Sequence, residues 1–71
     1  MFTEAEIKFI ELVKGLPETT RNSKSVAKQF QLIKNRVTGE KDDNCMCGMV
    51  YRKIYIKDFL TWYEDVNRYI P

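Results

Sequence analysis

The sequence predicts an all-α fold, a small three-helix domain with a long aromatic C-terminal helix. Apolar residues recur at three- and four-residue steps in three separate stretches, which is the period of a buried helix face. Glycine, proline and polar clusters separate those stretches. A chain of 71 residues with 44% hydrophobic and 31% charged residues has the composition and size of one folded domain, residues 1–71.

The first helix begins after Thr3. Thr3 and Glu6 have the spacing of a capping box, and Phe2 before the cap supplies half of a hydrophobic staple. Gly15 and Pro17 end the helix. Ile7 supplies the other half of the staple. The apolar stripe consists of Ile7, Phe9, Ile10, Val13 and Leu16.

The second helix follows a loop at residues 17–22 and begins near Asn22 or Ser23, either of which can cap it. Gly39 fits the position just past its C-terminus. Ala27 allows a neighbouring element to approach closely. The apolar face is made of Val26, Phe30, Ile33 and Val37.

The third helical region runs from about Cys45 to Tyr69, as one long helix or two shorter ones. A polar loop at residues 38–44 precedes it, and Asp42, Asp43 and Asn44 are good capping residues for its start. A strand at 50–56 is the alternative, because VYRKIYI alternates, but a lone strand would have no partner in the chain. The expected apolar seam is Met49, Ile56, Phe59, Leu60, Tyr63, Val66 and Ile70.

The charge distribution indicates where a polyanion would bind. The net charge is +2, yet residues 21–41 hold six basic residues and one acidic residue. A helix, a turn and a second basic helix is also the outline of a helix-turn-helix. The alternative is a solvated face or a protein contact. The candidate nucleic-acid contacts are Arg21, Lys24, Lys28, Gln31, Lys34 and Arg36.

The C-terminal region contains six of the nine aromatic residues, and one helix cannot turn all six inward. Tyrosine and tryptophan anchor protein interfaces, so this helix is expected to assemble subunits into a homo-oligomer. Stacking on single-stranded nucleic acid and a role in the core are the alternatives. The candidate interface residues are Tyr55, Phe59, Trp62, Tyr63 and Tyr69.

Catalysis and cofactor binding find little support. The chain has no histidine, no G-x-S-x-G and no P-loop, so we expect no enzyme. Zinc needs four ligands, and Cys45 and Cys47 supply two; a complete site would need two subunits to pool their thiolates, or carboxylates such as Asp42 or Asp43. The favoured interpretation is two half-buried thiols that pack a loop on the third helix, with no cofactor.

Two stretches resemble bacteriophage proteins. The order NRVTGEK, then C-x-C, then a basic aromatic helix ending FLTWYE resembles small uncharacterised proteins of tailed phages, over about half the chain. FTEAEIKFIELVKG is similar to the first helix of phage small terminase subunits, where a helix-turn-helix precedes an oligomerising helix. The resemblance implies a phage or prophage origin and carries over no site residues.

The functional prediction is therefore a small phage-type nucleic-acid-binding or DNA-packaging accessory protein that acts as an oligomer. The alternative is a non-enzymatic protein-binding module, either a virion component or an inhibitor that docks on a host protein complex. Expected partners are nucleic acid or a larger protein complex, with no membrane and no small-molecule substrate. The expected location is the host cytoplasm or the virion.

Overall fold

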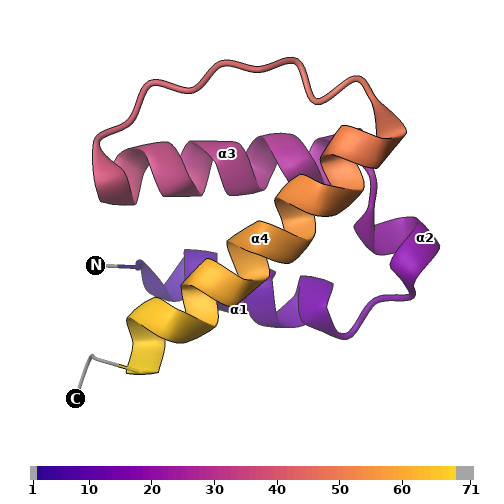
Figure 1. Cartoon of the computed structure of the whole chain (residues 1–71). Helices are drawn as coiled ribbons and strands as arrows, with labels where there is room; N and C mark the ends of the chain where they lie inside the picture. The colour runs from indigo at the N-terminus through magenta and orange to yellow at the C-terminus, as the bar shows by residue number, and fades with distance from the viewer. Residues whose placement is uncertain (1, 69–71) are drawn as a thin grey trace.

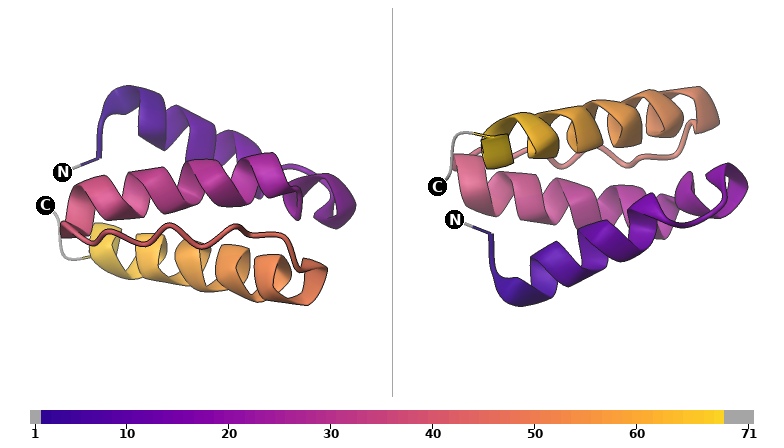
Figure 2. Two further views of the ribbon diagram at one scale, coloured as in Figure 1. Left: turned by 90° about the horizontal axis from the view of Figure 1, so that it is seen from above. Right: turned by 90° about the horizontal axis from the view of Figure 1, so that it is seen from below.

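The computed structural model describes residues 2–68, which form four helices: α1 (Glu4–Lys14), α2 (Glu18–Arg21), α3 (Lys24–Thr38) and α4 (Met49–Arg68). The predicted all-α class is confirmed, and the ambiguous segment at 50–56 is helical. Helix α1 runs opposite to α3, whereas α4 runs in broadly the same direction as α3 (Figures 1 and 2). Across residues 2–68, no helix is both long enough and apolar enough to cross a bilayer.

The capping box of α1 forms as predicted, whereas Ile7, which was predicted to complete the staple and to begin the buried stripe, is exposed. The Thr3 hydroxyl accepts a hydrogen bond from the Glu6 backbone N–H at 3.1 Å. The Glu6 carboxylate in turn accepts from the Thr3 N–H at 2.8 Å, which completes the capping box. After Lys14 the chain leaves the helix at Gly15, whose N–H donates to the Leu12 carbonyl.

The loop predicted at 17–22 is wrong in its centre, because Glu18–Arg21 form the single turn of α2. Pro17 has a fixed φ and no N–H to lose, which suits the start of a helix, and its carbonyl accepts from the Arg21 N–H at 2.9 Å. Helix α3 then begins at the Ser23 cap, whose hydroxyl accepts from the Val26 N–H at 3.2 Å. It ends at Gly39, which adopts the left-handed φ of 79°.

Residues 39–48, which we call the strap, return along the whole length of α3 before α4 begins (Figure 1). The prediction that residues 42–44 cap the last helix is wrong, because that helix starts only at Met49. The side chains of Asp42 and Asn44 instead accept hydrogen bonds from the backbone two residues further on. Asp42 Oδ1 accepts from the Asn44 N–H at 3.1 Å, and Asn44 Oδ1 accepts from the Met46 N–H at 3.3 Å.

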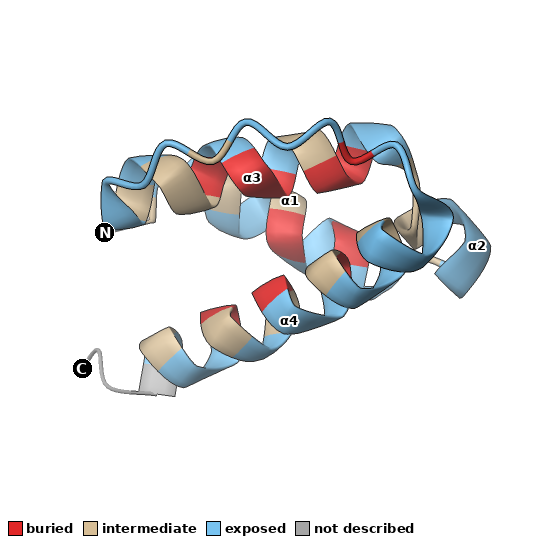
Figure 3. Ribbon diagram, turned by 45° about the horizontal axis from the view of Figure 1, so that its top comes forward, coloured by how far each residue is buried: buried red, intermediate tan, exposed pale blue. Residues whose placement is uncertain are grey.

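The core is built around Phe30 of α3. Its ring stacks on Phe59 of α4 with centroids 4.0 Å apart, and Phe9 of α1 meets it edge-on at 5.8 Å. Figure 3 shows the buried positions where the long helices face one another and on the strap. The buried hydrophobic residues are Ile10, Val13, Val26, Ala27, Phe30, Ile33, Met46, Ile56, Phe59 and Tyr63.

The seam predicted for α4 holds in its middle and fails at its start. Met49 is 68% exposed and is the first residue of α4. Leu60 and Trp62 of α4 are both half-buried. Ile70 lies outside the described residues.

Candidate functional site

The strap covers the face of α3 that was predicted to contact nucleic acid. Gln31 is 2% exposed, and its side-chain amide donates to the Asn44 carbonyl at 3.1 Å. The Lys28 ammonium donates to the same carbonyl at 3.0 Å. The Asn44 carbonyl of the strap thus accepts hydrogen bonds from two side chains on the polar side of α3. The prediction that Gln31 lies on a free surface is therefore wrong.

The C-terminal cations of α3 also have partners within the chain. Lys34 places its ammonium 5.7 Å from the Trp62 ring centroid. Arg36 forms a salt bridge with Glu6 of α1, with Nε donating to Oε2 at 2.8 Å, and this guanidinium lowers the pKa of Glu6. The structure thus places Lys28, Lys34 and Arg36 on different sides of α3 and engages each of them.

The two thiols are exposed, which corrects the prediction that they are half-buried. Met46 between them is the residue that packs, with no exposed surface and a left-handed φ of 57°. Hydrogen bonding from Cys47 and the charge of Lys24 lower the pKa of the Cys45 thiol. Among the described residues, no three histidine, cysteine or acidic side chains gather as a metal site would require.

The aromatic residues predicted to form an interface mostly belong to the core. Phe59 and Tyr63 are each 2% exposed, because they face α1 and α3, and the Tyr63 hydroxyl donates to Glu11. The prediction is wrong for these two residues. Trp62 is half-buried. Tyr69 lies outside the described residues.

Tyr55 is half-buried and stacks on Tyr51 with ring centroids 6.2 Å apart, as expected for positions i and i+4 of one helix. Burial, followed by the charge of Asp42, raises the pKa of the Tyr55 hydroxyl to about 12. Tyr55 and Trp62 are therefore the two described members of the predicted interface that reach the surface.

The largest exposed apolar side chains on α4 lie in its first two turns instead. Met49, Val50 and Ile54 are 68%, 74% and 55% exposed, and we call these three residues the α4 apolar face. Val50 and Ile54 are neighbours at i and i+4 and point away from the core side occupied by Ile56. Helical spacing predicts that Val50 and Ile54 are exposed, because both lie on the side of the helix opposite to Ile56. The sequence-based prediction missed them because Met49 was assigned to the seam and residues 50–56 were also considered as a strand.

Arg52 holds the start of α4 in place. Its Nε donates to the Asn22 carbonyl at 3.0 Å, and its terminal nitrogen donates to the carbonyls of Met46 and Cys47, each at 3.2 Å. One guanidinium thus joins the α2–α3 junction, the strap and α4. The α4 apolar face is consequently presented on an anchored helix rather than on a loose end.

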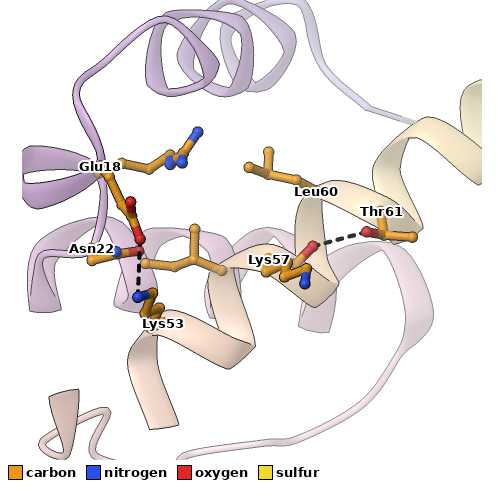
Figure 4. A pocket seen from close by; sticks show the side chains of 8 residues that line it. Glu18, Asn22, Lys53, Lys57, Leu60 and Thr61 are labelled. Carbon is orange, nitrogen blue, oxygen red and sulfur yellow. Dashed lines mark hydrogen bonds and ion pairs between the residues drawn. The ribbon is translucent and has the colours of Figure 1, made fainter. Parts of the chain in front are cut away.

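A pocket of about 240 Å³ lies between α2 and α4, next to this face; we call it the α2–α4 pocket. The Lys53 ammonium and the Glu18 carboxylate form an ion pair across it at 3.1 Å (Figure 4), and this contact lowers the pKa of Glu18. Two further cations line the pocket. Its lining residues are Glu18, Arg21, Asn22, Lys53, Ile56, Lys57, Leu60 and Thr61.

No protein-family model matches this chain, and no curated protein or solved structure matches it significantly.

Proposed function

We propose that the chain is a non-enzymatic protein-binding module that docks, through the α4 apolar face, on an acidic amphipathic segment of a partner protein. The exposure of Met49, Val50 and Ile54 carries this proposal. A group of large exposed apolar side chains within the first two turns of an anchored helix, two of them neighbours at i and i+4, is typical of a protein contact, whereas single exposed apolar residues are ordinary.

The burial of this face would supply useful binding free energy. Full burial of one such side chain contributes about 1.5–3 kcal/mol, and each is already partly covered. The remaining burial of Met49, Val50 and Ile54 is therefore worth on the order of 3–6 kcal/mol together, before the cost of association. A helix fixed by Arg52 loses little additional conformational freedom on binding.

The charge around the face selects the partner. Residues 18–24 and 49–58 together contain five cations and two carboxylates, Glu18 and Asp58, so this end of the molecule has an excess of positive charge. A partner segment with acidic side chains beside its apolar residues would complement this end of the molecule. A nucleic acid would satisfy the cations but would leave Val50 and Ile54 against a charged backbone. We therefore favour a protein partner over the nucleic-acid function predicted from the sequence.

The test compares paired variants of equal apolar loss. Val50→Ser/Ile54→Ser removes the face, and Leu12→Ser/Leu32→Ser removes two side chains of similar exposure (65% and 59%) on α1 and α3. A photo-crosslinking residue at Ile54 captures the partner in extract of the source cell, and the identified partner is then purified for calorimetry. We expect about a tenfold or greater loss of affinity for the first pair and less than about twofold for the control.

Three results would overturn the proposal. Equal losses for the two pairs would show that the α4 apolar face is not the contact. A stable dimer in native mass spectrometry that dissociates on Val50→Ser/Ile54→Ser would show that a second copy occupies the face. Binding to duplex DNA with a log–log salt slope of about −4 or steeper, unchanged by that pair, would restore the nucleic-acid function.

A further inference from the structure

We propose that the α2–α4 pocket binds one carboxylate group carried on a short apolar stem, the size of a glutamate side chain. The inference deepens the proposed function and rests on it for the source of that carboxylate, an acidic anchor residue of the partner. The pocket itself is argued from its own charge, lining and size.

The pocket has more positive charge than its single carboxylate can neutralise. Glu18 is paired with Lys53 at 3.1 Å. Within residues 2–68, the side chains of Arg21 and Lys57 make no hydrogen bond and no ion pair, although both line the same pocket. Two like charges that share a partly enclosed space repel each other, and an anion placed between them relieves that repulsion.

The types of donor that line the pocket suit a carboxylate. A guanidinium presents two parallel N–H groups to the two oxygens of a carboxylate, and an ammonium adds a point charge. The Thr61 hydroxyl is already used, because it donates to the Lys57 carbonyl at 3.1 Å (Figure 4). Recognition therefore depends on Arg21 and Lys57, with the Lys53–Glu18 pair as one wall.

The lining and volume limit the ligand to one small group. Ile56 is 1% exposed and Leu60 is half-buried, so both give the pocket an apolar wall that a methylene stem can contact. Pockets for drug-sized ligands measure roughly 300–1,000 Å³, and about 240 Å³ is below that range. One acidic side chain fits this space better than a nucleotide or a cofactor.

The pocket and the α4 apolar face are continuous along the helix. Ile54 of the face and Lys57 of the pocket are neighbours at i and i+3 of the helix. A partner segment seated on Val50 and Ile54 would place a residue about one turn away at the mouth of the pocket. The two features together describe a partner motif with an apolar anchor beside an acidic anchor.

The pocket can be tested without the partner. Glutarate is titrated into the ¹⁵N-labelled full chain, and amide chemical shifts are followed by NMR, with neutral glutaramide and inorganic phosphate as parallel arms. We expect saturable shifts centred on residues 18–22 and 53–61 with glutarate and none with glutaramide. Arg21→Gln/Lys57→Gln should weaken glutarate binding about tenfold or more, while Lys8→Gln/Lys41→Gln, which removes the same charge elsewhere, should change it less than about twofold.

The outcomes separate this inference from the proposed function. Shifts spread over all basic residues, or equal losses in the two double variants, would overturn the pocket and show general charge screening. Tighter binding of phosphate than of glutarate would overturn the carboxylate assignment. Saturable glutarate binding that depends on Arg21 and Lys57 supports the pocket even if Val50→Ser/Ile54→Ser leaves partner binding intact, in which case only the docking proposal fails.

Discussion

Met46 lies in the strap, outside the helices, and has no exposed surface. We expect Met46→Ala to lower the free energy of unfolding by about 2–3 kcal/mol. Truncation of a buried methionine to alanine costs roughly 2–5 kcal/mol, and an extended strap held by side-chain hydrogen bonds can partly close the gap, which favours the lower half of that range. For a domain of this size the melting temperature should fall by about 10–20 °C.

The assay is urea unfolding followed by the fluorescence of Trp62, the single tryptophan of the chain. Met49→Ala is a matched control, since the same residue type three positions later is 68% exposed and should change stability by less than about 0.5 kcal/mol. Met46→Gly gives a second check. The φ of 57° at this position disfavours alanine but not glycine, so Met46→Gly should be no less stable than Met46→Ala, against the usual order.

This reasoning would be refuted if the decreases in the free energy of unfolding caused by Met46→Ala and Met49→Ala differed by less than about 0.5 kcal/mol. The strap would then be a loop lying on the surface of α3. Its side chains would not belong to the core, and the burial of Gln31 beneath it would have no energetic meaning.

Three further predictions concern polar groups. Gln31→Met should destabilise the fold by about 1 kcal/mol in the same urea assay, because the Asn44 carbonyl loses one donor, and an unchanged midpoint would contradict that bond. Arg36 lowers the pKa of Glu6, so the pair stabilises the fold above the ordinary carboxyl pKa of 4.5, and this stabilisation is lost as the pH falls through the lowered pKa. In thermal melts at decreasing pH, the melting temperature of Glu6→Gln should therefore fall less than that of the unchanged chain. Parallel curves for the two proteins would contradict this prediction. The pKa of Tyr55 is raised from 10.0 to about 12, so its contribution to the stability of the fold is full below pH 10 and is lost as the pH rises towards 12. Tyr55→Phe should therefore reduce the fall in stability between pH 10 and 12, and its ultraviolet titration should lack the late tyrosinate step.

The parts of the fold that were predictable depend on residues close together in sequence. The capping box of Thr3 and Glu6, the Ser23 cap and the left-handed Gly39 each involve groups within four residues. The predicted stripe of α3 is likewise confirmed at Val26, Phe30 and Ile33. Local chemistry decides these features, so the sequence alone is sufficient for them.

The candidate site was harder to predict because it depends on where the strap lies. A helical projection of α3 puts Lys28 and Gln31 opposite the apolar stripe, and nothing local to them shows that Asn44, more than ten residues away, will bond to both. Helix α4 was expected to start near Cys45 and starts at Met49, so a residue that was predicted for the interior of the seam lies at the end of the helix and is exposed.

The strap also has a consequence for the order of folding. A short turn after α3 would have made the next helix antiparallel, whereas the returning strap lets α4 run in broadly the same direction as α3 (Figure 2). Contacts such as Phe30 with Phe59 therefore close a long stretch of chain, which raises the contact order above that of an up-and-down bundle. The locally capped helices α1 and α3 can form within microseconds. The docking of α4 must wait for the strap to close, so the rate-limiting step in folding this helical protein is expected to be set by its one extended segment.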